Sequence, residues 1–348
     1  MTGPDAPGAT MPAAVLTGPA ALEVRALPVP VPGPDEVLVE VGWCGICGTD
    51  LHLALEGYGR PGTVLGHEWS GTVAALGPGV TGIEIGTVVV ADDAPACGTC
   101  RPCRRGRPSV CLRRPAPDHL AFRGAFTRYV VVERDRVLPV PAGLDSRAAA
   151  LTEPVAIALH AMHVAEATEP GLRILVTGAG PVGLLMVAVL AAHGVTDVTV
   201  SEPATTRRDR AAALGARAVL TPDDLPAAPM GRPVPAPYDL AFECSGHAGA
   251  AAQALDQLDA AGTLVFVGTG RELPRVNHNR MIILELTALG AYNYDAAGFA
   301  PALELLASGR LPLDLLIEPA DVALADVLPT MHRLAAGALA GKVMVRPR

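Results

Sequence analysis

The stretch Arg173-Ile174-Leu175-Val176-Thr177-Gly178-Ala179-Gly180-Pro181-Val182-Gly183 decides the fold of this chain. A short apolar run, typical of a buried strand, leads into the pattern G-x-G-x-x-G, and a predicted helix from Leu184 to about Ala192 follows. The first glycine of such a pattern makes a tight turn, the second lets the backbone approach a pyrophosphate, and the third packs helix on strand. The helix N-terminus adds N–H donors for the phosphates. We therefore predict that a dinucleotide binds at Gly178, Gly180, Pro181, Val182 and Gly183.

The regions on either side of this motif differ in their predicted secondary structure. Downstream, strands are predicted at 198–202, 218–220, 238–243, 263–268 and 286–292, separated by helical stretches. Such alternation builds βαβ units, so the fold class is α/β with a doubly wound, six-stranded parallel sheet. Upstream of about residue 150, short alternating runs such as Glu36-Val37-Leu38-Val39-Glu40-Val41 predict a mostly β region.

One acidic residue bears on the choice of dinucleotide. Glu202 lies nineteen residues after Gly183, at the end of the next predicted strand. A carboxylate there accepts hydrogen bonds from the adenosine ribose hydroxyls and repels a 2′-phosphate, which favours NAD. Arg207 and Arg208 keep NADP open as an alternative, because an arginine beyond that strand can bind the phosphate. We also expect Val267, at the end of a later strand, to contact the cofactor.

Four of the seven cysteines fall within fifteen residues, as Cys97, Cys100, Cys103 and Cys111. Four thiolates at this spacing can surround zinc as a closed tetrahedron with no position left for substrate. The alternative is a group of buried structural thiols, but a loop rich in arginine and glycine offers little core for them to join. The pattern predicts a structural zinc.

A second set of metal-binding residue types is spread over the mostly β region. Cys47, His67, Glu68 and Glu153 supply a thiolate, an imidazole and carboxylates, which can hold zinc and keep one position open, as a catalytic site requires. Asp50 is placed to receive the other ring N–H of His67. Each residue alone has an ordinary structural explanation, and the pair Cys44-x-x-Cys47 also permits a redox dithiol. We favour the zinc interpretation.

Length and composition exclude several classes of protein. The 348 residues allow two or three domains, and half of them are hydrophobic, as in a globular chain. The net charge of −8 disfavours a nucleic-acid partner, which requires a basic surface. Neither an N-terminal signal peptide nor an apolar run long enough for a membrane span is present, so we expect a soluble cytoplasmic protein.

Taken together, these motifs resemble those of the zinc-containing medium-chain dehydrogenases, the superfamily of alcohol, sorbitol and threonine dehydrogenases. The resemblance rests on Cys44-Gly45-Ile46-Cys47-Gly48-Thr49-Asp50-Leu51-His52, Gly66-His67-Glu68, Glu153-Pro154, the four-cysteine segment, the glycine motif and the closing Gly341-Lys342-Val343. It implies a GroES-like, mostly β catalytic domain from residues 11–154 and 294–348 around a Rossmann domain of residues 155–293. Residues 1–10 are expected to be a disordered tail.

The resemblance also implies roles for individual residues. Cys47, rather than Cys44, is the zinc ligand, followed by His67 and Glu68, with Glu153 binding the metal directly or through water. Thr49 and His52 match the proton relay of the family. Local similarity to polyol, threonine and aminocyclitol dehydrogenases, the last from antibiotic pathways, implies an NAD(P)-linked oxidation of a secondary alcohol, with two zinc ions per chain and a homodimer or homotetramer. Threonine oxidation, a zinc-free enone or quinone reductase and a non-catalytic nucleotide-binding protein are the alternatives.

Overall fold

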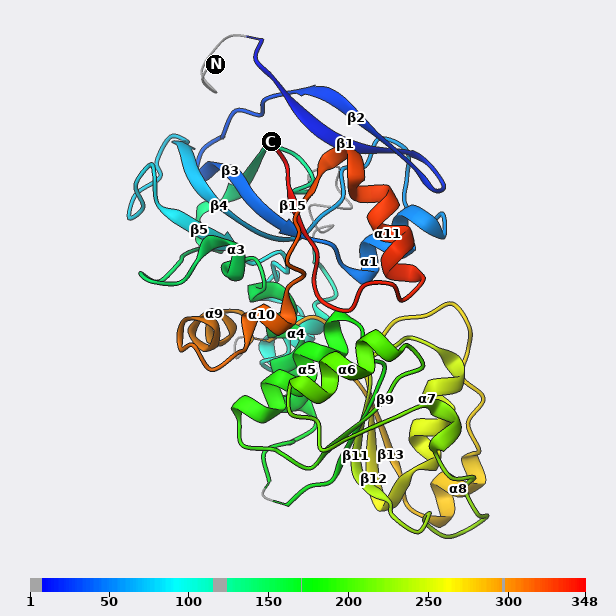
Figure 1. Cartoon of the computed structure of the whole chain (residues 1–348). Coiled ribbons are helices and arrows are strands. Elements are labelled where there is room, and N and C mark those ends of the chain that lie inside the picture. Colours follow the sequence, from blue (N-terminus) through cyan, green and yellow to red (C-terminus); the bar gives the residue numbers. More distant parts are fainter. Residues whose placement is uncertain (1–7, 115–123, 170, 296–297) are drawn as a thin grey trace.

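The computed structural model describes residues 8–114, 124–169, 171–295 and 298–348. These residues form two lobes, and Figure 1 shows the first and the last strand in the same lobe. Most of the predicted tail of residues 1–10 lies outside the described residues. Its boundary is slightly too late, because Thr10 already begins the first strand.

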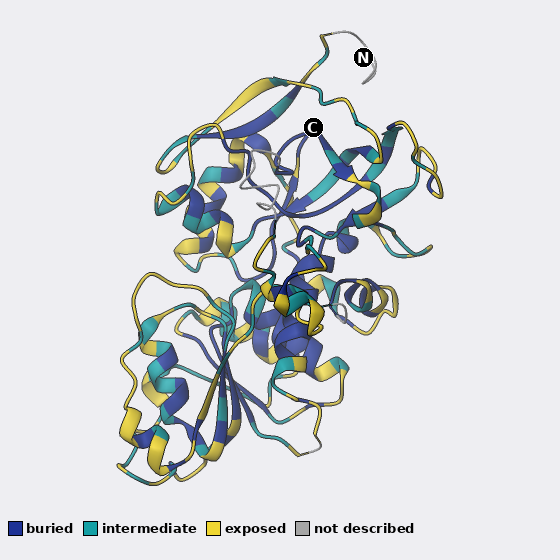
Figure 2. Cartoon of the chain, turned by 180° about the vertical axis from the view of Figure 1, so that it is seen from behind, coloured by how far each residue is buried: buried dark blue, intermediate teal, exposed yellow. Residues whose placement is uncertain are grey.

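The lobe that carries the glycine motif contains a six-stranded sheet in the order β10-β9-β8-β11-β12-β13. Every neighbouring pair is parallel, so the predicted parallel sheet is confirmed. Figure 2 shows that its inner strands are almost entirely buried, as expected when helices cover both faces. The strands are β8 (Ile174–Thr177), β9 (Val198–Ser201), β10 (Ala218–Leu220), β11 (Tyr238–Glu243), β12 (Leu258–Phe266) and β13 (Thr287–Gly290).

The other lobe contains a sheet in the order β14-β15-β3-β4-β5-β7, to which β6 adds by pairing with β3. The chain returns to this sheet at its very end, where Val345 pairs with Cys44 in an antiparallel ladder. The C-terminal segment therefore completes the lobe that the N-terminal half begins. The strands are β3 (Glu36–Gly45), β4 (Glu68–Leu76), β5 (Val88–Ala91), β6 (Tyr129–Glu133), β7 (Val137–Pro139), β14 (Val322–Ala323) and β15 (Met344–Arg346), besides the separate hairpin of β1 (Thr10–Gly18) and β2 (Ala21–Pro28).

The helices are short, and among the described residues none is long and apolar enough to cross a membrane. They are α1 (Gly48–Leu55), α2 (Arg101–Arg104), α3 (Ser146–Ala149), α4 (Thr152–Val164), α5 (Pro181–Ala192), α6 (Thr205–Ala213), α7 (Ala248–Asp256), α8 (His278–Ile283), α9 (Phe299–Ala307), α10 (Leu313–Leu316) and α11 (Val327–Ala335).

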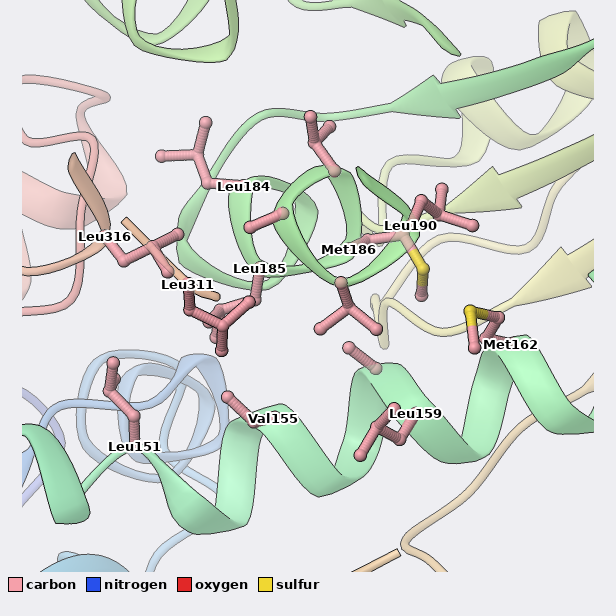
Figure 3. Close-up of a cluster of buried hydrophobic side chains, with 14 of the residues drawn as sticks. Leu151, Val155, Leu159, Met162, Leu184, Leu185, Met186, Leu190, Leu311 and Leu316 are labelled. Carbon is pink, nitrogen blue, oxygen red and sulfur yellow. The ribbon is translucent and has the colours of Figure 1, made fainter. Parts of the chain in front are cut away.

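The apolar helix α5 is buried between the parallel sheet and α4. Figure 3 shows Val155 and Met162 of α4 pointing toward Leu185 and Met186 of α5, with Leu311 close by. All of these side chains belong to the largest hydrophobic cluster of the molecule. This packing fixes the start of α5, and with it the glycine motif, relative to α4.

The glycine motif adopts the geometry that its pattern predicts. Gly178 has a φ of +87°, a left-handed conformation that other residues rarely adopt. A Cβ on Gly183 would lie 1.9 Å from the carbonyl oxygen of Gly178, so only glycine permits the contact between helix and turn. Proline at the first helical position of α5 needs no hydrogen-bond acceptor there.

Candidate active site

Cys47, His67 and Glu68, which we call the mixed cluster, come together near the cleft between the lobes. Their ligand atoms all lie within 4.8 Å of one another. The pairing of Gly45 with Glu68 across β3 and β4 produces this proximity, because Cys47 follows β3 and His67 precedes β4. Sulfur, imidazole nitrogen and carboxylate oxygen are all zinc donors, so these residues can hold the ion.

Asp50 joins the two segments that carry the mixed cluster. This fully buried carboxylate accepts hydrogen bonds from the backbone N–H of Cys47, at 2.9 Å, and of Gly66, at 3.1 Å. Its Oδ1 lies 3.8 Å from Nδ1 of His67, which is longer than a hydrogen bond. The predicted hydrogen bond to the ring is thus absent from this arrangement, and Asp50 acts on His67 through its charge.

Glu68 pairs with Lys342, from the segment that precedes β15. The Lys342 ammonium lies 2.7 Å from Oε1 of Glu68 and 3.3 Å from the carbonyl oxygen of Ile46. The other carboxylate oxygen, Oε2, is buried and has no hydrogen-bond partner among the described residues. A buried carboxylate oxygen without a donor is costly, and a bound cation would remove that cost. This observation supports a metal ion at the mixed cluster.

The pKa values in the mixed cluster are strongly shifted. Burial raises the pKa of the Cys47 thiol, and the nearby Glu68 raises it further. Burial alone would lower the pKa of His67, but the charges of Cys47, Asp50 and Glu153 outweigh it and raise that pKa well above its usual value. The site thus concentrates negative charge around one imidazole, and a divalent cation would be strongly attracted to it.

Glu153 lies in the first turn of α4, beside the mixed cluster but outside the group within 4.8 Å. It is buried and makes no hydrogen bond or ion pair with any described residue. Burial, offset in part by His67, raises the pKa of this carboxyl to about 8. Glu153 is thus a further buried carboxyl beside the residues that can hold a metal ion.

Thr49 and His52 lie one turn apart on α1. The Thr49 hydroxyl oxygen is 3.7 Å from the sulfur of Cys47. His52 is partly exposed, with Nδ1 3.0 Å from a carboxylate oxygen of Glu56 and Nε2 3.1 Å from the carbonyl oxygen of Thr269 in the other lobe. The two side chains therefore lead from the mixed cluster toward solvent.

A groove joins the glycine motif to the mixed cluster. One wall comes from the lobe with the parallel sheet and the other from the lobe with β3 and β15, including Cys47 and Lys342. The lining residues assigned to the cofactor from the sequence are Gly178, Gly180, Pro181, Val182, Glu202 and Arg207. Gly183 and Val267 do not line it, since Gly183 packs under the turn and Val267 follows β12. A ligand in this groove touches both lobes.

Glu202 and Arg207 have structural partners of their own. The buried Glu202 carboxylate accepts hydrogen bonds from the backbone N–H of Ala179, at 2.8 Å, and of Ala204, at 2.9 Å. Arg207 donates to the carbonyl oxygens of Leu334 and Leu339 in the other lobe. Each oxygen of Glu202 keeps a further lone pair, so these contacts are compatible with the predicted contact to ribose.

The four-cysteine lobe, residues 97–111, brings together Cys97, Cys100, Cys103 and Cys111 as a second group within 4.8 Å. The Cys100 sulfur lies 3.3 Å from that of Cys103 and 3.8 Å from that of Cys111, so these thiols are not disulfides. The edge of a tetrahedron with zinc–sulfur bonds of about 2.3 Å is about 3.8 Å. The backbone N–H of Thr99 lowers the pKa of Cys97 to about 5, which favours a thiolate ligand. This lobe fits the predicted zinc.

Comparison with known proteins agrees with this geometry. Residues 33–142 match the family Alcohol dehydrogenase GroES-like domain, and residues 181–308 match the family Zinc-binding dehydrogenase. The chain is 34% identical to an L-threonine 3-dehydrogenase of Pyrococcus abyssi over 306 residues, 85% of this chain and 86% of the relative. It is 32% identical to a sorbitol dehydrogenase of Bacillus subtilis over 315 residues, 86% of each protein.

The chain belongs to the zinc-containing medium-chain dehydrogenases.

Solved structures extend this likeness over nearly the whole chain. A dehydrogenase of Sinorhizobium meliloti described as zinc-binding, with NADP bound, superposes with a TM-score of 0.86 at 31% identity, covering 97% of this chain and 100% of that one. Galactitol-1-phosphate dehydrogenase of Escherichia coli gives the same TM-score and coverage at 27% identity. Zinc and NAD(P) are thus the cofactors of this medium-chain dehydrogenase, and its reaction is of the alcohol dehydrogenase type.

Some features of the site have no counterpart in the sequence motifs. The pairing of Lys342 with Glu68 is one, and the contact of Tyr294 with Asp92 and Asp93 is another. One signal points to Lys342: it is the only lysine of the chain, beside 26 arginines. A chain that uses arginine everywhere else and lysine once indicates a place where only a compact ammonium fits.

Proposed function

We propose that this medium-chain dehydrogenase interconverts a secondary alcohol and its ketone at the mixed cluster, with the nicotinamide cofactor in the adjoining groove. The observation that carries this proposal is the groove itself, because its lining runs from Gly178 and Gly180 to Cys47 and Lys342. A cofactor held at the glycine motif would extend toward the mixed cluster without leaving the protein.

Cys47, His67 and Glu68 would hold the catalytic zinc, with Glu153 closing the site through water. A zinc ion held there would supply a Lewis acid that lowers the pKa of a hydroxyl group bound to it. The buried walls of the site exclude water and keep the substrate oxygen close to Thr49. A bound NAD(P)⁺ would supply the hydride acceptor, so that the alcohol carbon would give up a hydride and the hydroxyl group a separate proton, and the product would be a ketone.

Thr49 and His52 are our candidates for moving that proton. The Thr49 hydroxyl stands beside Cys47, and its position on α1 puts His52 one turn further toward solvent. His52 can pass a proton on because one ring nitrogen faces Glu56, which is itself partly exposed. Asp50 keeps the two ligand-bearing segments at a fixed spacing while this happens.

Polyols and aminocyclitols are our substrate candidates within the secondary alcohols, with threonine as the second candidate because L-threonine 3-dehydrogenases are among the relatives. NAD is favoured over NADP by the buried carboxylate of Glu202 in the groove. We also propose that the enzyme is a homodimer or homotetramer, which light scattering after size-exclusion chromatography would test.

The Cys47→Ala variant tests the assignment of the catalytic metal. We expect it to lose one of two bound zinc ions and all measurable NADH formation from a panel of secondary alcohols, while it still binds NADH. The matched control is Cys44→Ala. The buried thiol of Cys44 is three residues from Cys47 and belongs neither to the mixed cluster nor to the four-cysteine lobe. Substantial turnover by Cys47→Ala would contradict the assignment.

A further inference from the structure

A histidine of α1 contacts the other lobe at the edge of the groove. Nε2 of His52 lies 3.1 Å from the carbonyl oxygen of Thr269, in the segment that follows β12. On one side of the cleft, His52 adjoins Leu51, which lines the groove. On the other side, Gly246 adjoins the groove residue Ser245, and a Cβ on Gly246 would collide with the carbonyl oxygen of Thr269. The contact therefore spans the cleft directly beside the groove.

The other ring nitrogen of His52 also faces an acceptor. Nδ1 lies 3.0 Å from Oε1 of Glu56, one helical turn further along α1. A carbonyl oxygen has no proton to donate, and neither has an ionised carboxylate. Both contacts are therefore hydrogen bonds only when the imidazole carries a proton on each nitrogen. A neutral His52 keeps one of these hydrogen bonds and loses the other.

Glu56 decides which hydrogen bond a neutral His52 keeps. An N–H group binds a charged carboxylate more strongly than a neutral carbonyl, so the single proton stays on Nδ1. Nε2 then turns its lone pair toward the carbonyl oxygen of Thr269, and the contact between the lobes becomes repulsive. A second proton that arrives at Nε2 restores the hydrogen bond. The contact across the cleft thus depends on whether His52 is charged.

Glu56 is itself held from the other lobe. Its second oxygen, Oε2, is buried, accepts no hydrogen bond from any described residue and lies 3.9 Å from Nε of Arg271. The guanidinium of Arg271 also lies over the ring of Tyr58, 5.6 Å from its centroid. Arg271 follows Thr269 by two positions, so both contacts across the cleft use the same segment. A protonated His52 and Arg271 therefore place two cations on one carboxylate.

No further charged group of the described residues forms a hydrogen bond or ion pair with His52 or Glu56. Besides the segment after β12, the elements that pack most closely against α1 are α11 and β2. Their charged residues make no such contact with α1; they are Glu23 and Arg25, which pair with each other, and His332 and Arg333. Since imidazole titrates between pH 5 and 8, the proton on His52 is the charge that changes at this contact in that range.

We propose that Glu56 positions His52 so that Nε2 takes up the proton, and that this proton ties the two lobes together through the carbonyl oxygen of Thr269. The proton on His52 then controls how fast a nicotinamide cofactor leaves the groove. The proposal rests on the proposed function where it takes His52 as the receiver of the substrate's proton. In that reaction the lobes are held together while the proton remains on His52, and they are released once it has passed to solvent.

The rate of NADH release tests this proposal. We would measure it by stopped-flow fluorescence with the zinc-loaded enzyme, between pH 5.5 and 8.5 and with no alcohol present. In the wild-type enzyme, release should become about tenfold faster as the pH rises, because a hydrogen bond from a charged donor is lost when His52 loses its proton. A rate that stays constant or falls with rising pH would overturn the proposal.

Two substitutions of His52 separate the effect of its proton from that of the side chain. In His52→Gln the amide N–H donates to the carbonyl oxygen of Thr269 at every pH, so release should be slow and independent of pH. In His52→Ala the contact is absent, so release should be fast and again independent of pH. A pH dependence like that of the wild type in either variant would show that another group controls release, and it would overturn the proposal.

Glu56→Gln tests whether Glu56 positions the ring. Its amide can donate to Nδ1, which lets a neutral His52 keep its proton on Nε2. Release should then stay slow at pH 8.5, whereas a merely structural defect would make it faster. The matched control is Arg271→Gln, which removes the ion pair with Glu56 and keeps the contact of Glu56 with His52; release should be faster at every pH, with the pH dependence preserved. Fast release from Glu56→Gln at pH 8.5 would overturn the role of Glu56.

Turnover separates this proposal from the proposed function, because NADH release is measured without alcohol. Oxidation of secondary alcohols by an enzyme whose NADH release does not change with pH would sustain the dehydrogenase and overturn the role of the lobe contact. Release that depends on the proton of His52, in an enzyme that oxidises no secondary alcohol, would do the reverse.

Discussion

The ammonium of Lys342 lies 2.7 Å from a carboxylate oxygen of Glu68, and each side chain is only 1% exposed. The two residues come from opposite ends of the chain, and β15 brings them together by pairing with β3. Burial alone would lower the pKa of Lys342, but Glu68 and the other acidic groups outweigh it and raise that pKa. The only lysine of the sequence therefore stays charged, beside a residue that can bind metal.

Removal of Lys342 should destabilise the metal-free protein. The Lys342→Met variant leaves the Glu68 carboxylate buried without its partner, which typically costs about 3–5 kcal/mol. Urea denaturation of the zinc-free proteins would measure the loss. The double variant Lys342→Met/Glu68→Gln should recover most of it, because neither position then leaves an unpaired buried charge. If the single and double variants are equally unstable, the pair does not contribute as described.

Local motifs made much of the site predictable from sequence. The four-cysteine lobe and the glycine motif each lie within fifteen residues, and the chemistry of their residue types fixes what they can bind. Their geometry depends little on the rest of the fold. The grouping of Cys47 with His67 and Glu68 required more, because only the pairing of β3 with β4 brings the two segments together.

Contacts between distant segments could not be predicted in this way. Glu68 and Lys342 are 274 positions apart, and Asp93 and Tyr294 are 201 apart. No local pattern records such a pair, since it depends on where the C-terminal segment rejoins the sheet. The interpretation of Asp50 shows the same limit. Its importance was predictable, but its hydrogen bonds go to the backbone of Cys47 and Gly66 rather than to the His67 ring.

Glu153 should make the metal-free protein less stable as the pH rises. Burial raises its pKa from 4.5 to about 8, so between these values the folded state binds a proton that the unfolded state has released. The contribution is fully present below about pH 4.5 and is lost as the pH rises to about 8, at no more than about 1.4 kcal/mol per pH unit. Glu153→Gln cannot lose this proton. Thermal unfolding should therefore show a Tm advantage of the variant over wild type that grows between pH 5 and pH 8, and a constant difference would contradict this origin.

Removal of metal should open the four-cysteine lobe to protease. Among its residues only Cys100 and Ser109 are buried, so the lobe has no hydrophobic core of its own and depends on a bound ion. We expect trypsin to cleave after Arg104 or Arg105 much faster once a chelator has removed zinc, as mass spectrometry of a limited digest would show. In Cys47→Ala with zinc present the lobe should stay resistant, because that substitution affects the other metal group. Equal cleavage with and without chelator would show that the lobe is stable alone.

Glu202 should govern the choice between NAD and NADP. Glu202→Gln keeps the size of the side chain and removes the charge that repels a 2′-phosphate, but its single carbonyl oxygen can accept from only one of the backbone N–H groups of Ala179 and Ala204. We expect the ratio of kcat/KM for NAD to that for NADP to fall about tenfold, the effect of a hydrogen bond to a charged group. Glu202→Ala is the matched comparison: it also frees the turn at Ala179, so it should weaken both cofactors. If Glu202→Gln lowers kcat/KM equally for NAD and for NADP, Glu202 only supports the glycine motif and does not distinguish the two cofactors at the ribose.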